Sequence, residues 1–157
     1  MTDTPAAQLR QLLHARSVAA LGTLHAGAPY VSMVPFAIAR DGSGFIIHVS
    51  RLASHTRDML TDARVSLLVM QEVGGGSSVL ALARVSIQGT AQELASDAPD
   101  LARSRAAYLE RFPEAAQMFG FADFSLFKIE AESVRFVAGF AQAHSFSGDS
   151  LNRLLVG

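Results

Sequence analysis

Short apolar stretches separated by polar turns run through most of the chain. These stretches have the length and the β-branched or aromatic content of β-strands. Glycine, proline and aspartate mark the connections between them, as in His25–Pro29 and Asp41–Gly44. The pattern predicts strands at Val18–Leu24, Tyr30–Arg40, Phe45–Val49, Val65–Val69, Leu80–Leu94, Ser125–Glu130 and Val134–Phe140.

Apolar residues at helical spacing predict helices at both ends of the chain and between some of the strands. Thr4 followed by Pro5 is typical of a helix start, because threonine caps the free N–H groups and proline fits the first turn. The predicted helices cover Pro5–Arg16, a short segment from Ser54, a segment from Asp97 that Phe112 and Pro113 end, Glu114–Phe119, and a C-terminal segment through Leu151, Leu154 and Leu155 with Asp149 or Ser150 as its N-cap.

The order of these elements predicts the fold class. Most strands are joined by short turns, which favours antiparallel pairing over parallel strands linked by crossover helices. Six or seven strands with about three helices fit a small closed or split antiparallel β-barrel with flanking helices. We find no repeat and no linker, so residues 1–157 are expected to form a single domain.

Composition restricts the partners of the protein. Half of the 157 residues are hydrophobic and only 17% are charged, and a buried homodimer interface would absorb this apolar excess, although a rich core is an alternative explanation. The formal net charge of −1 argues against nucleic acid and against an anionic membrane surface. The chain has no cysteine, no membrane-length apolar run and no signal-peptide pattern, so we expect a cytoplasmic protein.

The turn at Ser50–Arg57 is the best candidate for chemistry. It precedes a predicted helix, whose N-terminus offers free N–H groups and a partial positive charge to a phosphate. In one interpretation Ser54, His55, Thr56 and Arg57 hold such a phosphate. In the other, Ser54 is an ordinary N-cap and its neighbours are exposed helix residues. The residue types alone leave both interpretations open.

Other candidates are isolated along the sequence. His48 interrupts an apolar strand, and a lone histidine there is more often structural than catalytic. Arg84 lies in an apolar strand and either reaches a ligand or occupies a surface position. His14, His25 and His144 have no spacing that suggests a shared metal site.

Six segments in order carry a further signal: Ala19–Leu24, Pro29–Phe36, Ser50–Arg57, Asp62–Leu68, Gly89–Ala91 and Val137–His144. Together they resemble the FMN-binding split-barrel family related to pyridoxamine 5′-phosphate oxidase, and in particular its heme-utilisation-like branch. The resemblance covers nearly the whole chain. It implies a split barrel and a homodimer in which FMN lies at the seam between two protomers.

The resemblance also implies roles for individual residues. Ser32, Met33, Val34 and Pro35 would run along the flavin ring and the ribityl chain, and His48, Val49 and Ser50 would flank the same cofactor. His55 and Thr56 stand where the pyridoxamine phosphate oxidases carry an Arg-Lys pair on the phosphate, and Arg84 stands where they carry a glutamine. Arg57 and Arg84 are then expected to supply the missing positive charge.

The expected function is that of an FMN-binding protein and flavin-dependent oxidoreductase acting on a small-molecule substrate that the sequence does not identify. The flavin would carry the redox chemistry, and no catalytic side chain is assigned. Two alternatives share the fold: a heme-binding or heme-degrading protein, with His144 as the expected iron ligand, and a non-enzymatic flavin-binding module.

Overall fold

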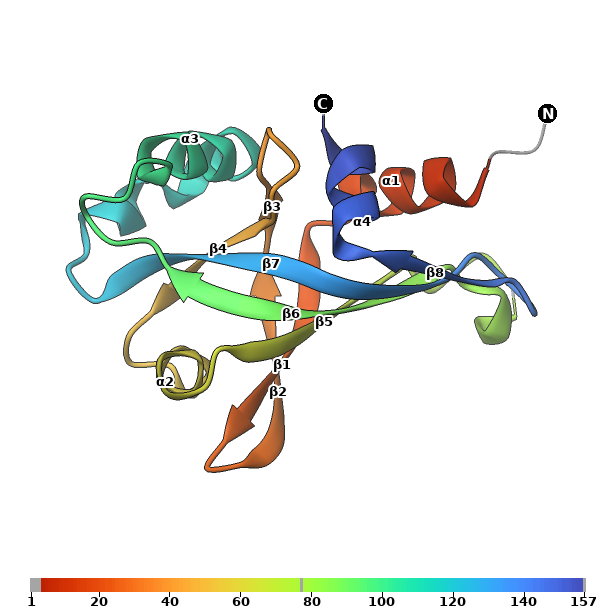
Figure 1. The fold of residues 1–157 in the computed structure, drawn as a ribbon, viewed down its shortest axis with the longest axis horizontal. Coiled ribbons are helices and arrows are strands. Elements are labelled where there is room, and N and C mark those ends of the chain that lie inside the picture. The colour runs from red at the N-terminus through yellow and green to blue at the C-terminus, as the bar shows by residue number, and fades with distance from the viewer. Residues whose placement is uncertain (1–3, 77, 157) are drawn as a thin grey trace.

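The computed structural model describes residues 4–76 and 78–156, and in them a single antiparallel sheet curves into a half-barrel (Figure 1). This confirms the predicted fold class. The strands are β1 (Val18–His25), β2 (Ala28–Pro35), β3 (Ala37–Ile38), β4 (Phe45–Ser50), β5 (Arg64–Met70), β6 (Arg84–Glu93), β7 (Phe124–Val137) and β8 (Ala143–Ser147).

The sheet curves because one stretch of chain supplies both of its edges. The strand order is β2-β1-β5-β6-β7-β4-β3, with β8 added beside β7. The edge strands β2 and β3 are separated only by Phe36, so the chain leaves β1 at Pro35 and joins β4 at Ala37. Proline has no N–H to donate to a ladder, and Pro35 accordingly ends β2.

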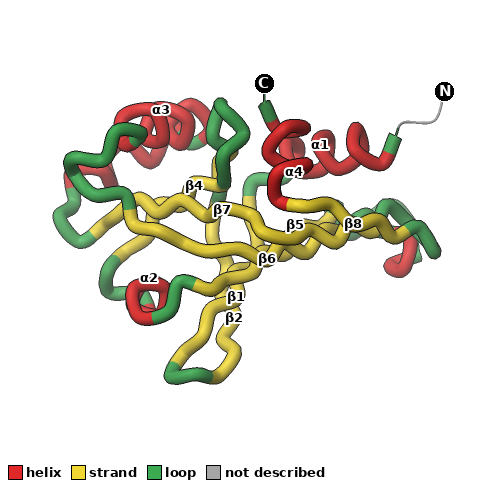
Figure 2. The backbone as a smooth tube through the Cα atoms, in the orientation of Figure 1, coloured by secondary structure: helices red, strands yellow, loops and turns green. Residues whose placement is uncertain are grey.

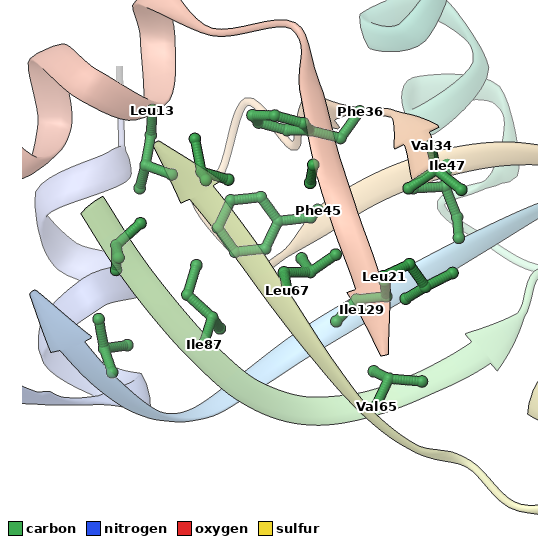
Figure 3. Packing of buried hydrophobic residues seen from close by; sticks show 14 of the residues in the cluster. Leu13, Leu21, Val34, Phe36, Phe45, Ile47, Val65, Leu67, Ile87 and Ile129 are labelled. Atoms are coloured by element: carbon green, nitrogen blue, oxygen red, sulfur yellow. The ribbon is translucent and has the colours of Figure 1, made fainter. Parts of the chain in front are cut away.

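The main core fills the inside of this curved sheet (Figure 3). On β5, Val65, Leu67 and Val69 point inward and the residues between them are exposed, which is the alternation of a half-buried strand. Strand β4 is buried on both faces, because a second cluster that includes Ile46 packs under a helix on its outer side.

In the part of the chain that the structure describes, four α-helices flank the sheet (Figure 2): α1 (Pro5–Ala15), α2 (Ser54–Thr61), α3 (Leu101–Arg111) and α4 (Gly148–Leu155), with 3-10 turns at Val79–Ala81 and Pro113–Gly120. Helices α1 and α4 lie together, and Arg10 on α1 donates to the Leu154 carbonyl at 2.7 Å. Helix α3 covers β3 and β4, whereas α2 packs against β1 at the other side of the sheet. The predicted cap of α1 is confirmed, since the Thr4 hydroxyl accepts from the Ala7 N–H at 3.1 Å.

Several predicted boundaries were wrong. The strands expected at Ser125–Glu130 and Val134–Phe140 are one strand, β7, and Leu80–Leu94 begins as a strand only at Arg84. The pairing of β6 with β7 contains a β-bulge at Gly89: Gln88 pairs with Ser133 and Gly89 with Ala131, which leaves Glu132 as the extra residue on β7.

The C-terminal segment also differs from its prediction. Strand β8 was missed, and the N-cap of α4 is Ser147, whose hydroxyl accepts from the Ser150 N–H, rather than Asp149 or Ser150. In residues 4–76 and 78–156, no helix has both the length and the apolar character that a membrane span needs.

Candidate functional site

Ser50 organises the turn that leads from β4 into α2. Its carbonyl accepts the Ala53 N–H at 3.1 Å and the Thr56 hydroxyl at 2.6 Å. Its own hydroxyl accepts the Leu52 N–H at 3.1 Å. The polar groups of Ser50 are therefore used to shape the turn.

Two residues of this turn are placed differently from the sequence interpretation. Ser54 is not the N-cap: Ala53 occupies that position, and no side chain of the described residues caps the helix. Thr56 is fully buried, and its hydroxyl donates to the Ser50 carbonyl. The first turn presents Ser54 and the half-buried His55 at its surface, with Arg57 exposed one step further along.

The start of α2 can attract an anion. An uncapped first turn leaves backbone N–H groups for an external acceptor, and the helix dipole adds partial positive charge. The first turn contains no acidic side chain. Burial lowers the pKa of His55, an effect that Asp58 opposes, so at neutral pH His55 offers an imidazole hydrogen bond rather than a fixed charge.

A buried carboxylate joins α2 to the β1–β2 hairpin. Asp58 is only 5% exposed, and its two oxygens accept from the Thr23 hydroxyl at 2.9 Å and pair with His25 Nδ1 at 2.7 Å. Burial alone raises the pKa of Asp58, but the hydrogen bonds from His25 and Thr23 outweigh it and hold the pKa below its ordinary value. Asp58 is therefore ionised at neutral pH.

Strand β2 contributes an unsatisfied polar atom. The Ser32 hydroxyl is buried and has no hydrogen-bond partner among the described residues. A buried hydroxyl without a partner is costly, and a ligand or a water molecule is the usual explanation. On the same strand Val34 is packed in the main core, whereas Met33 and Pro35 are exposed.

His48 and Val49 point to opposite faces of β4. Val49 lies in the main core. His48 is 8% exposed and stacks on Phe119, with ring centroids 3.9 Å apart. Its ring lines a cleft of about 570 Å³ under α3, together with Arg51 and Arg105. Burial, assisted by Arg105, lowers the pKa of His48.

Arg84 and His144 lie far from α2. Arg84 is at the β8 end of the sheet, opposite Val137, and its guanidinium donates to the Leu80 and Leu82 carbonyls at 3.0 Å. Arg84 pairs with Met70 of β5, and Arg64, which follows α2, starts the same strand. Six residues of strand, about 20 Å, therefore separate Met70 from Arg64. On β8, His144 pairs with Phe136 of β7, so it lies at the same distant end of the sheet (Figure 1). Within one chain the structure does not bring these two residues to the α2 turn.

Sequence reasoning missed the cluster of Thr23, His25 and Asp58. These residues are distant in sequence, and only the packing of α2 on β1 brings them together. No spacing along the sequence links these three residues. Within residues 4–76 and 78–156, no group of three or more histidine and acidic side chains is arranged to hold a metal ion.

This fold and the landmark segments can be compared with known proteins. Residues 5–138 match the sequence profile described as pyridoxamine 5′-phosphate oxidase. The chain belongs to the pyridoxamine 5′-phosphate oxidase family. The resemblance inferred from the sequence is thereby confirmed.

Two relatives of this family member have names that concern heme. It is 36% identical over 149 residues to the chloroplastic heme oxygenase HOZ of Arabidopsis thaliana, covering 93% of this chain and 44% of that protein. It is 28% identical over 146 residues to heme oxygenase HutZ of Vibrio cholerae serotype O1, covering 92% of this chain and 82% of HutZ.

A solved structure supports the same branch of the family. The heme binding protein from Mycobacterium smegmatis superimposes with a TM-score of 0.86 at 28% identity, covering 98% of this chain and 62% of that one. The chain thus spans less than half of the Arabidopsis relative and less than two thirds of the mycobacterial protein.

Proposed function

We propose that this protein binds heme. The observation that carries the proposal is its similarity, over more than nine tenths of its length, to two proteins named heme oxygenases. A bound heme would supply a redox-active iron in a planar, largely apolar ring with carboxylate side chains. The chain's own residues would bind and orient this ring.

The residues around α2 suit such a ligand in two respects. The uncapped first turn, with Ser54, His55 and Arg57 beside it, offers hydrogen-bond donors to a carboxylate. The nearby His25 has one ring nitrogen held by Asp58 and a side chain that is 56% exposed, so an imidazole is available at the surface. The sequence resemblance instead assigns the iron to His144, on β8.

A hemin titration tests the proposal. We expect the Soret band of hemin to shift and sharpen on addition of the purified protein, with saturation at one heme per chain. Hemin also raises the melting temperature if it binds the folded state selectively. A spectrum identical to that of free hemin, with an unchanged melting temperature, would contradict heme binding.

FMN is the second candidate, and the Ser32 hydroxyl favours it. This buried, unpartnered hydroxyl lies on the strand that the family resemblance places along the flavin ring and ribityl chain, and flavin binding would give it a partner. The phosphate would then bind the first turn of α2, next to His55 and Arg57. In this alternative the protein is a flavin-dependent oxidoreductase of unidentified substrate, or a flavin-binding module without turnover.

The same preparation distinguishes the two cofactors. FMN binding would quench flavin fluorescence, and Ser32→Ala would weaken it while leaving the hemin spectrum unchanged. The matched control is Ser43→Ala, because Ser43 is a serine in the β3–β4 turn whose hydroxyl donates to Asp41. Fluorescence that is equally quenched in Ser32→Ala and Ser43→Ala would remove Ser32 from the flavin site.

The proposal extends to the quaternary structure. Exposed apolar side chains on the outer face of β2 and β5, among them Val31, Met33 and Leu68, would be covered in a homodimer. Arg84 begins β6 beside Met70 of this face, so in a dimer it could reach the site of the partner. A cytoplasmic location stays a prediction from the sequence.

A further inference from the structure

His48 is a buried polar side chain that has no hydrogen-bond partner among the described residues. It is 8% exposed, and one face of its ring is stacked on Phe119. Burial and the charge of Arg105 lower its pKa, and no hydrogen bond to the ring contributes. The fully enclosed, unpaired side-chain atoms of the described chain belong to Arg16 and Ser32, so the nitrogens of His48 retain some access to the cleft that it lines. A buried group in this state usually meets a ligand or ordered water.

The cleft has the size and the walls of a small-molecule site. Its volume of about 570 Å³ lies under α3, beside β4 and the start of β7. Small organic ligands occupy cavities of roughly 300–1,000 Å³ whose walls are mostly apolar. Here the apolar wall includes Leu94, Leu101, Phe119, Phe124 and Leu126. The ring of Phe124 lies 5.1 Å from that of His48, so a ligand held by the imidazole would also meet an aromatic surface.

The charged side chains of the cleft favour a ligand with a single negative charge. Its ionisable groups are His48, Arg51, Glu93 and Arg105. Arg51 and Glu93 form an ion pair and cancel one another. His48 is neutral at neutral pH because its pKa is lowered. Arg105 therefore leaves the cleft with one net positive charge.

Arg105 is held in a way that leaves its N–H groups available. Its guanidinium lies 4.8 Å from the centroid of the Phe119 ring, a cation–π contact. No carboxylate of the described residues forms an ion pair with it; the cleft's one carboxylate, Glu93, pairs with Arg51. Because Arg105 and His48 both contact Phe119, one ligand of modest size can reach both.

We propose that the cleft under α3 binds a small aromatic monocarboxylate, with Arg105 as the partner of the carboxylate and His48 as a second hydrogen-bond donor. The ring of the ligand would pack on Phe124 and its apolar neighbours. A dianion fits less well, because it exceeds the net charge of the cleft and meets Glu93. The site is independent of the cofactor proposed for the start of α2. It gives His48 a ligand other than the flavin that the resemblance implied.

Three other cavities fit such a ligand less well. The cavity beside Lys128 has a volume of about 150 Å³, which is small for a ring with a carboxylate. In the cavity beside His14, the charge of Arg40 is already paired with Glu110. The groove beside Tyr30 lies on the outer face of the sheet, which the proposed homodimer would cover.

Titration with three small probes tests the class of ligand. We expect isothermal titration calorimetry to give a Kd for benzoate below about 1 mM. Benzamide has the same shape without the charge, and acetate has the charge without the ring, so each should bind at least about 10-fold more weakly. Benzoate should also shift the NMR signals of the His48 ring, which are identified by their absence in His48→Phe.

Substitutions in the cleft test the two polar roles. Arg105→Gln should weaken benzoate binding by about 10-fold or more, and Arg105→Lys, which keeps the charge, should weaken it less. His48→Phe keeps the stacking on Phe119 but removes the donor, so it should cost about 5-fold. Arg103→Gln is the matched control, because Arg103 is exposed on α3 and lines a different cavity. Circular dichroism confirms that each variant is folded.

Each outcome decides for or against the site. Wild-type protein that does not bind benzoate at several millimolar would overturn it. Equal affinities for benzoate and benzamide, or equal losses in Arg105→Gln and Arg103→Gln, would also overturn it, because no anion would then be recognised. Displacement of benzoate by hemin or FMN would make the cleft part of the cofactor site. Unchanged benzoate binding in the presence of either cofactor would support a separate site, whether or not the proposed heme binding holds.

Discussion

The Thr56 hydroxyl stabilises the turn before α2. It is fully buried and donates to the Ser50 carbonyl, which also receives the Ala53 N–H. Thr56→Val keeps the shape of the side chain but leaves the carbonyl with one donor fewer. We expect the free energy of unfolding to fall by about 1–3 kcal/mol, as measured by urea denaturation.

Thr61→Val is the control for this substitution. The Thr61 hydroxyl also donates to a carbonyl, that of Arg57, but it is exposed, so water can replace the lost bond. Its effect should stay within about 0.5 kcal/mol. Equal losses in the two variants would mean that burial of Thr56 does not matter to the turn.

Buried histidines make the protein less stable in mild acid. Burial lowers the pKa of His48 below its ordinary value of 6.5, so the unfolded chain takes up this proton at a higher pH than the folded one. The free energy of unfolding should therefore decrease as pH falls through about 6.5. His14 and His55 act in the same direction.

His48→Phe tests the contribution of this one residue. Phenylalanine preserves the stacking on Phe119 and does not titrate. The melting temperature of the variant should decline less than that of the wild type between about pH 7.5 and about pH 5.5. Asp58 does not disturb the comparison, because its lowered pKa affects stability only in stronger acid. Identical declines would show that His48 does not contribute.

For individual residues, the sequence predicted less than it did for the fold. The start of α2 was located correctly, because Ser50–Arg57 follows a strand and precedes a helix. The roles of the individual residues in this turn were not predicted, because whether a threonine side chain points inward depends on the packing of α2. His25 and Asp58 meet only through that packing, and no pattern along the chain records their contact.

At the scale of elements, Gly89 allows β6 and β7 to approach at the bulge. A Cβ atom at this position would lie 2.1 Å from the Glu130 carbonyl oxygen, a contact that only a backbone shift can relieve. Gly89→Ala should lower the free energy of unfolding by about 1–3 kcal/mol or more, because the clash is with backbone. Chemical denaturation measures the loss.

Gly139→Ala is the matched control. Its added Cβ would be 3.6 Å from the Ala81 carbonyl oxygen, an ordinary contact. We expect a loss below about 1 kcal/mol. A loss as large as that of Gly89→Ala would show that the cost comes from losing glycine itself rather than from the bulge.

Strand β7 shows why some elements could not be predicted from pattern alone. Its sequence reads as two strands because Ala131, Glu132 and Ser133 interrupt the apolar alternation. In the structure the strand is continuous through this point and contains a β-bulge at Glu132, opposite Gly89. A bulge and a turn look alike in sequence, and the pairing partner decides between them.

At the scale of the whole molecule, the curved sheet has an inner face that packs the main core and an outer face that exposes some apolar side chains. Across the outer face, Met33 of β2, Ala20 of β1 and Leu68 of β5 are paired neighbours in one row. Met33 is 63% exposed and Leu68 is 38% exposed. A row of apolar and small side chains on neighbouring strands could be covered by a second copy related by twofold symmetry.

Charge substitutions on this face test the proposed homodimer. Met33→Glu places a charge on each protomer within the proposed interface, so sedimentation velocity should show a shift from dimer to monomer at micromolar concentration, with an unchanged circular dichroism spectrum. Leu68→Glu, in the same row, should act in the same direction. Leu52→Glu is the control, because Leu52 is 77% exposed in the turn before α2 and outside this face. A wild-type protein that sediments as a monomer would contradict the dimer outright, and a dimer that persists in both row variants would move the interface elsewhere.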